Sequence, residues 1–404
     1  MSGSGQLAQR SLKEWAIRGG AAALLAVAGY FSMAQTVAQV VVKDDPALAA
    51  RIAPWDGRIL SAGFESIPAS SDFTERSMQA QDALRRDPTA VNAVAQLGLA
   101  AQARGDVAGA GRLFRYAERL SRRDLQTQLW AIEDAVGRDD IAGVLRHYDV
   151  ALRTKAQSRA ILYPVLASAI NDAQVRAELV RTLAGRPLWA DDFLGYAASS
   201  KENSQATAAL LAALHQRHVP VPEPVNAALI GSMVARGQGE AAWRFYAAVR
   251  GHADRRRARD PRFSAVLAAP TVFDWTPVND GSVTGSIQPS GSNGLFDFYV
   301  VPGGGGALLK QMQLLPPGTY HLSGHSRGIE QERRALPYWV LLCGSRELGR
   351  VEVPNSAEAG GRFAGLLTVT AGCPVQTLTL IARPSESVSG LVGQIDRLEL
   401  APAP

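Results

Sequence analysis

Two stretches of the chain repeat one pattern at a spacing of 34 positions: Leu97–Ala117 reads LGLAAQARGDVAGAGRLFRYA and Ala131–Ala151 reads AIEDAVGRDDIAGVLRHYDVA. In both, apolar residues recur every three or four positions, which is the period of an amphipathic helix. Gly105 separates two such helices in the first stretch and permits a tight turn between them. The pattern therefore predicts two helical hairpins, one after the other.

The recurring positions carry mostly small or aromatic residues. Small side chains let two helix backbones approach closely, and the aromatic rings fill the gap between one hairpin and the next. A single hairpin leaves an apolar face that only a neighbouring hairpin covers, so such units occur in stacks. The predicted repeat signature comprises Leu97, Gly98, Ala101, Ala110, Phe114, Ala117, Tyr148 and Ala151.

This signature, with Pro88 closing a preceding unit, resembles the tetratricopeptide-repeat family. Val94 stands where the family has a large aromatic residue, and the second stretch matches less well than the first. The resemblance implies a right-handed superhelix with a concave groove that binds peptides or proteins. It implies no reaction.

Helical periodicity extends beyond these repeats, and we assign residues 72–260 to one α-solenoid. The 34-residue register is lost after Lys155, although the helical period continues. The basic run Arg255–Arg259 is interpreted as a solvated linker face or, alternatively, as a docking patch for an acidic partner or lipid headgroups. Helices are expected at 73–86, 89–104, 107–121, 124–137, 141–154, 158–169, 173–184, 190–199 and 204–218, with one more hairpin in 226–246.

An uncharged run of 24 residues, 19–42, follows a basic N-terminal segment. About 20 apolar residues cross a bilayer as a helix, and basic flanks stay in the cytoplasm. The sequence thus predicts a cytoplasmic tail (1–18), a transmembrane helix (19–42) and a linker (43–71), with the rest of the chain exported. Two alternatives stay open: a signal peptide cleaved after Ser32-Met33-Ala34, and a buried core helix.

From residue 261 the helical period gives way to short apolar runs broken by Gly, Pro, Ser and Asn. Such runs are typical of antiparallel β proteins. We expect residues 261–404 to form a jelly-roll-like antiparallel β-sandwich, so the whole chain is multidomain α + β. The predicted strands are 272–275, 282–287, 295–301, 307–314, 318–326, 338–343, 347–353, 363–369, 375–382 and 390–400.

Three short motifs in this region resemble carbohydrate-binding modules and galactose-binding-like jelly rolls. Residues 316–324 (PPGTYHLSG) are similar to the strand after their proline-glycine turn, and residues 394–400 (QIDRLEL) to their closing strand. The opening residues 272–275 (VFDW) are similar to the aromatic start of modules that follow tetratricopeptide repeats in bacterial envelope proteins. The resemblance implies a domain for ligand binding or packing without specifying a sugar.

The chain has two cysteines, Cys343 and Cys373, at the ends of two predicted strands. They are interpreted as one disulfide or, alternatively, as two buried thiols. Export to an oxidising compartment favours the disulfide. A bridge that closes a loop of this length adds about 3 kcal/mol in the chain-entropy description.

Exposed aromatic rings stack on sugar rings, so Trp275, Trp339 and Tyr299 are candidate ligand-binding residues, although such residues are often core. His321 is a further candidate, and it shares one strand face with His325 because the strand period is two. The sequence has no HExxH motif, and its one G-x-S-x-G match, at 324–328, overlaps a predicted strand with no helical pattern after it, unlike a nucleophile elbow. We therefore expect no catalytic, metal or cofactor-binding residues.

The net charge of +5 over 404 residues is a small overall surplus, whereas nucleic-acid binding needs a concentrated basic face, so we expect no nucleic-acid partner. The sequence as a whole predicts a non-catalytic, single-pass inner-membrane protein whose bulk is periplasmic. We expect it to act as a scaffold or adaptor for an envelope or exopolysaccharide export complex, with protein partners on its helical repeats. Carbohydrate binding by the β-sandwich is the alternative, which makes polysaccharide a second class of partner, and a glycan-processing enzyme is a third hypothesis.

Overall fold

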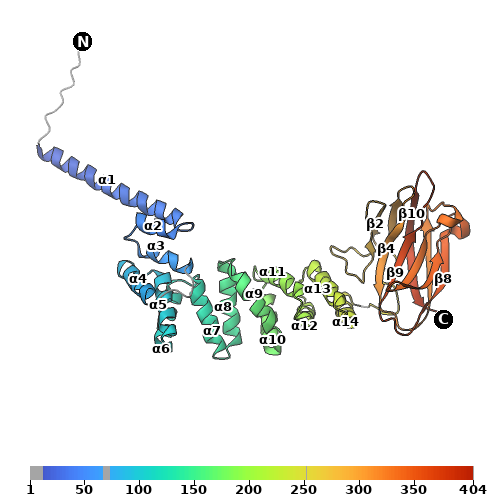
Figure 1. The fold of residues 1–404 in the computed structure, drawn as a ribbon, viewed down its shortest axis with the longest axis horizontal. Coiled ribbons are helices and arrows are strands. Elements are labelled where there is room, and N and C mark those ends of the chain that lie inside the picture. The colour runs from blue at the N-terminus through green and yellow to red at the C-terminus, as the bar shows by residue number, and fades with distance from the viewer. Residues whose placement is uncertain (1–11, 67–72, 252, 404) are drawn as a thin grey trace, which may run out of the picture. The chain divides into compact units, whose positions relative to one another are not determined.

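The computed structural model describes residues 12–66, 73–251 and 253–403. The chain forms two compact units, Met1–Arg159 and Ala160–Pro404. The sequence had placed a boundary between residues 260 and 261, where helices give way to strands. The second unit contains both the later helices and the whole β-sandwich, and the change from helices to strands lies within it (Figure 1).

The first unit opens with helix α1 (Leu12–Val41), which is long and apolar enough to cross a membrane. A signal sequence or the core helix of a soluble protein would pass the same test. The segment expected to be a linker forms two short helices, α2 (Pro46–Ile52) and α3 (Gly57–Ala62), followed by the 3-10 turn η1 (Gly63–Ser66). Asp45 and Asp56 cap α2 and α3, because their carboxylates accept hydrogen bonds from backbone N–H groups in each first turn.

The repeat stretches form helical hairpins, in which α5 packs with α6 and α7 with α8 (Figure 1). Ala101, Ala110, Phe114 and Ala117 are all buried, and a Cβ on Gly98 would lie 2.8 Å from the Phe114 ring. The Phe114 ring stacks on Trp130 of the next hairpin at a centroid distance of 4.9 Å. The bounds are α4 Phe73–Arg86, α5 Val91–Ala103, α6 Val107–Leu120, α7 Leu125–Val136 and α8 Ile141–Thr154.

The second unit begins with further helices that bury large apolar side chains between them. Trp189, Phe193 and Leu179 are each less than 2% exposed. Asp172 caps one of these helices by accepting hydrogen bonds from two backbone N–H groups. The bounds are α9 Ser158–Ala169, α10 Ala173–Ala184, α11 Ala190–Ser199, α12 Ser204–Gln216, α13 Glu223–Ala235 and α14 Gly239–Arg250.

The β-sandwich consists of two five-stranded antiparallel sheets, with strand orders β1-β4-β9-β6-β7 and β2-β3-β10-β5-β8 (Figure 1). Large side chains alternate along the strands and fill the space between the sheets, as Phe296 and Phe298 do on β3. The bounds are β1 Thr276–Pro277, β2 Val283–Ser290, β3 Asn293–Val300, β4 Gly306–Gln313, β5 Gly318–Arg327, β6 Tyr338–Cys343, β7 Arg346–Glu352, β8 Arg362–Val369, β9 Gln376–Ala382 and β10 Leu391–Pro402, with 3-10 turns η2 (Arg333–Ala335) and η3 (Glu358–Gly361).

Two features at the ends of strands complete the sandwich. Cys343, at the end of β6, is joined to Cys373 in the loop before β9 by a disulfide with an S–S distance of 2.10 Å. Residues 272–275, expected to be a strand, form a turn instead, because the Asp274 side chain accepts a hydrogen bond from the backbone N–H of Thr271. The first strand therefore starts at Thr276.

Candidate functional site

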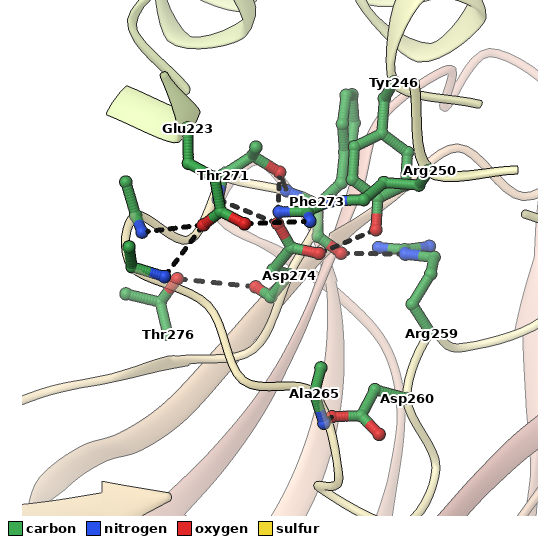
Figure 2. Close-up of polar contacts among 12 residues, drawn as sticks. Glu223, Tyr246, Arg250, Arg259, Asp260, Ala265, Thr271, Phe273, Asp274 and Thr276 are labelled. Atoms are coloured by element: carbon green, nitrogen blue, oxygen red, sulfur yellow. Dashed lines mark hydrogen bonds and ion pairs between the residues drawn. The ribbon is translucent and has the colours of Figure 1, made fainter. Parts of the chain in front are cut away.

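A buried polar cluster joins helices α13 and α14 to the β-sandwich (Figure 2). Asp274 lies at its centre, and its carboxylate accepts hydrogen bonds from the Tyr246 hydroxyl at 2.7 Å and from the Thr271 hydroxyl at 2.9 Å. Arg250 of α14 lies 3.7 Å from the same carboxylate. Burial, and then the Asp274 carboxylate, raise the pKa of Tyr246 above its usual range. The tyrosine therefore stays neutral and donates a hydrogen bond to Asp274.

Arg259 forms the second half of this cluster, and its guanidinium is buried. It donates to the Phe273 carbonyl at 2.8 Å (Figure 2), and also to Gln313 Oε1 at 2.7 Å and to the Met312 carbonyl. It also lies over the Trp243 ring of α14, at 5.1 Å from the centroid. Burial lowers the pKa of Arg259 to about 10.

The basic run Arg255–Arg259 is thus internal at Arg259, whereas the side chains of Arg256 and Arg257 are exposed, as expected for a solvated face. Arg255 forms an ion pair with Glu240 of α14 at 2.5 Å, and Arg259 is enclosed. The partners of Tyr246, Arg259 and Asp274 come from the chain itself. We interpret this cluster, called the joint below, as a structural link and not as a site for a ligand.

The two tryptophans proposed as sugar platforms are in the core. Trp339 is 0% exposed and Trp275 is 3% exposed, and their rings meet edge to face at 5.7 Å. Trp275 also donates its ring N–H to the Asp260 carbonyl at 3.0 Å. Neither ring has an exposed face, because both rings lie in the core between the two sheets. Burial there removes their large apolar area from water, which stabilises the fold. Both residues are therefore corrected from ligand-binding candidates to core residues.

The other two candidates, Tyr299 and His321, both lie on the outer face of the sheet β2-β3-β10-β5-β8. Tyr299 is 42% exposed and pairs with Val392 of β10, whereas His321 is half-buried and pairs with Ala401 of the same strand. Nine residues along a strand correspond to about 30 Å. The structure thus places these two side chains on one surface but does not bring them together.

A hollow of about 510 Å³ lies on this outer face between the two ends, over β5, β8 and β10. Its floor is made of small residues, Ser323, Gly324 and Ala364, beside the Phe363 ring. A Cβ on Gly324 would lie 2.3 Å from the ring of Phe363, which belongs to the core between the sheets, so this position requires glycine. Four larger side chains form the rim of what we call the hollow: His325, Arg362, Asp396 and Arg397.

A β-bulge in β10 supplies two of the rim residues. The register against β5 shifts between Ile395 and Arg397, so Asp396 is the extra residue. Ile395 and Leu398 on either side are buried, and both Asp396 and Arg397 consequently face outward. Bulges re-aim side chains in this way and are frequent beside binding sites.

Charges around the hollow are predominantly positive. Asp396 lies 2.8 Å from both His325 Nδ1 and the Arg327 guanidinium, and Glu399 pairs with Arg397 at 3.3 Å and with Arg257 at 3.5 Å. The Arg362 side chain has no ion pair or hydrogen-bond partner in the described part of the chain. Arg257 also lies 3.5 Å from Asp254, so four guanidinium groups face three carboxylates, and the guanidinium of Arg362 is the one without a carboxylate partner.

A row of hydrogen-bonding side chains continues from the hollow toward Tyr299. Gln394 of β10 neighbours Arg327 of β5 and donates to Asp297 of β3 at 2.9 Å. Asp297 is two residues from Tyr299 on the same strand face. From Arg362 to Tyr299 this row spans three strand spacings and five residues, or about 22 Å. The surface is long enough for an extended ligand.

The sequence had marked His321 and Tyr299 on this surface but none of the rim residues as site candidates. Arg362, His325 and Asp396 come from strands far apart in the chain, and only the sheet order makes them neighbours. The residues described here contain no group of three His, Cys, Asp or Glu side chains placed to hold a metal ion.

Comparison with known proteins finds no matching family model and no matching curated protein. The resemblance to tetratricopeptide repeats therefore stays an interpretation of the helical hairpins. Among solved structures, one match is TmCBM61 in complex with beta-1,4-galactotriose (TM-score 0.25, 16% identity, 36% of this chain and 97% of that one). Others are the enzymatically active domain of tailspike protein 4 of bacteriophage CBA120 (0.24, 13%, 33% and 20%) and a Bacillus thuringiensis Cry1Da core variant (0.22, 12%, 32% and 23%). These low scores carry no functional argument.

Proposed function

We propose that this chain is a membrane-anchored, non-catalytic adaptor of a bacterial cell envelope. In this proposal α1 crosses the inner membrane with its N-terminal end in the cytoplasm. The helical hairpins and the β-sandwich lie in the periplasm and bind protein partners of an envelope or exopolysaccharide export complex. The surface of α1 is the observation that carries the proposal.

Helix α1 divides into a bare part and a packed part. All residues from Lys13 to Met33 are exposed, including Leu25 at 74%, and the uncharged part of the helix, from Gly19 to Val41, has 23 residues and spans about 35 Å. The hydrocarbon core of a bilayer is about 30 Å thick. From Ala34 onward one side of the helix is buried, and Ala38 packs against Ala49. An uncharged helix of this length whose first part is exposed on all sides calls for lipid, and its packed end joins it to α2 and α3.

The disulfide supports export of the C-terminal domain. Disulfides persist in the periplasm and are rare in the cytoplasm, where thiols are kept reduced. The bridge between Cys343 and Cys373 thus supports the topology that basic Lys13 and Arg18 favour at the other end of the chain.

Membrane extraction tests the anchor. The full chain should stay in the membrane pellet after alkaline carbonate treatment. Leu25→Arg should release it or prevent its accumulation, because a charge at the centre of a span costs about 2.5–3.5 kcal/mol on insertion scales. Leu188→Arg is the matched control, since Leu188 is 88% exposed outside α1. Recovery of the wild-type chain in the soluble fraction with reduced cysteines would reject the anchor.

Co-purification tests the adaptor role. The full chain, extracted in a mild detergent, should purify with other envelope proteins in a fixed ratio, and the Leu188→Arg control should retain them. A chain that purifies alone after chemical cross-linking in intact cells argues against an adaptor.

A second candidate function is binding of a glycan by the outer face of the β-sandwich, and the hollow favours it. Saccharides offer hydroxyl groups in a row along with apolar ring faces. The row from Arg362 through Gln394 and Asp297 offers donors and acceptors, and the exposed pair Tyr299 and Val392 adds apolar surface at its end. This function is compatible with the adaptor role, and the test in the next subsection applies to it directly.

A further inference from the structure

We infer that the hollow binds an acidic saccharide and that Arg362 pairs with the carboxylate of the sugar. This inference rests on glycan binding as the second candidate function and names its ligand class. Three features of the hollow carry it: its charge, its shape and the row of side chains that leads away from it.

The charge of the hollow selects an anion. Asp396 is already engaged by His325 and Arg327, and Glu399 by Arg257 and Arg397. Asp254 also pairs with Arg257, so one positive charge remains, and it is that of Arg362. A neutral sugar would leave the Arg362 guanidinium without a counter-charge, whereas a carboxylate matches its planar fork of donors.

The shape of the hollow suits a ring rather than a point charge. The small floor at Gly324 and Ala364 leaves about 510 Å³ open beside the guanidinium, far more than a simple ion fills. Polar groups lie on several sides of this space, with Ser323 of β5 in the floor and His325 of β5 and Arg397 of β10 in the rim. A sugar ring with one carboxylate and several hydroxyls fits this combination.

The row from the hollow to Tyr299 favours a polymer over a single sugar. It offers an amide at Gln394, a carboxylate at Asp297 and an aromatic ring at Tyr299 along about 22 Å. Neutral hydroxyls satisfy the amide and the carboxylate, and Tyr299 lies at the end away from Arg362. The expected ligand is therefore a polyuronate-like chain with its acidic group in the hollow.

The test measures binding of the full chain, in detergent micelles, to polygalacturonate and to the same polymer after reduction of its carboxyl groups. We expect binding to polygalacturonate that weakens with added salt and little binding to the reduced polymer. Arg362→Gln should weaken binding about tenfold or more, because it removes charge-assisted hydrogen bonds. Arg346→Gln on β7 of the other sheet is the matched control and should bind as the wild type does.

A second variant tests the hollow itself without removing charge. Ala364 is exposed, so Ala364→Trp should fill the hollow from outside, leave the core intact and abolish binding. Unchanged binding by Arg362→Gln or by Ala364→Trp would overturn the inference. Equal binding of polyphosphate would also overturn it, since any polyanion would then suffice.

The outcomes separate this inference from the proposed functions. Equal binding of the reduced polymer rejects the acidic class but retains glycan binding by the sandwich. Binding of neither polymer rejects the acidic saccharide as ligand of the hollow. The adaptor role stands or falls with the membrane and co-purification experiments.

Discussion

The joint and the hollow use the same residue types in opposite ways. In the joint, the Arg259 guanidinium is enclosed by carbonyl and amide oxygens and by the Trp243 ring. At the hollow, the Arg362 guanidinium is exposed and has no partner in the described residues. The two aspartates differ likewise: Asp274 is buried, at 6% exposure, whereas Asp396 lies on the rim of the hollow.

This difference indicates which charges are available for binding. A buried charge is tolerated only when its partners are already in place, so its hydrogen-bonding capacity is taken up inside the fold. An exposed charge keeps its hydration and exchanges it for a ligand at moderate cost. A strongly perturbed pKa, as at Tyr246 and Arg259, marks enclosure here and not catalysis.

The largest expected effect comes from exchanging the two arginines for glutamine. Arg259→Gln should lower the free energy of unfolding of the second unit by about 3–5 kcal/mol, because it breaks a buried charge network. Arg362→Gln should change it by less than about 0.5 kcal/mol, as surface substitutions usually do. Urea denaturation of the full chain, followed by tryptophan fluorescence, measures both. Similar losses in the two variants would contradict the distinction between joint and hollow.

The next largest effect on the free energy of unfolding is expected from replacing the tyrosine of the joint, Tyr246, in comparison with Tyr299 of the outer sheet face. Tyr246→Phe removes the hydroxyl that donates to Asp274 at 2.7 Å, and a hydrogen bond to a charged group contributes about 1.5–3 kcal/mol. Tyr299→Phe removes an exposed hydroxyl and should leave the free energy of unfolding nearly unchanged. The same denaturation curves report both, and a stability loss at Tyr299 would show that the outer face is covered in the folded protein.

Local signals in the sequence were sufficient for the helices and most strands. Helices α4 and α8 have the predicted bounds, since Asp-Pro after Arg86 and the Asp140 cap before Ile141 are signals within a few residues. Ten strands were predicted. The first, at 272–275, is a turn, because the backbone N–H of Thr271 bonds to the Asp274 side chain and not to a neighbouring strand. The prediction of a linker at 43–71 did not include helices α2 and α3, although each begins after an aspartate cap of the same kind as Asp140.

The site was less predictable for physical reasons. A tryptophan in an alternating strand faces either the core or the solvent, and Trp339 faces the core only because a second sheet covers that side. The extra residue Asp396 is defined by its register against β5, which is 71 residues earlier in the chain at His325. Arg362 and His325 become neighbours through the pairing of β8 with β5. None of these relations is encoded locally.

A pH titration sharpens the account of the joint. The pKa of Tyr246 is raised in the folded chain, chiefly by burial, so the folded state holds this proton more tightly than the unfolded chain does. Its stabilising contribution is complete below the unfolded tyrosine pKa of about 10 and is lost as the pH rises further. The stability difference between wild type and Tyr246→Phe should thus be constant from about pH 7 to 9 and shrink above about pH 10. Arg259 is present in both proteins, and a constant difference at high pH would contradict the assigned burial.

The smallest effect on stability, and the most informative sign, is expected at Asp396. Asp396→Asn breaks exposed ion pairs with Arg327 and His325 and should cost about 0–1 kcal/mol of folding free energy. It also removes the carboxylate that opposes an incoming anion, so binding of polygalacturonate should tighten severalfold. Asp274→Asn, the matched change in the joint, should instead destabilise the second unit without changing the affinity of the molecules that remain folded. Weaker binding by Asp396→Asn would mean that this carboxylate holds Arg327 and His325 in position for the ligand, and that the charge excess alone does not determine affinity.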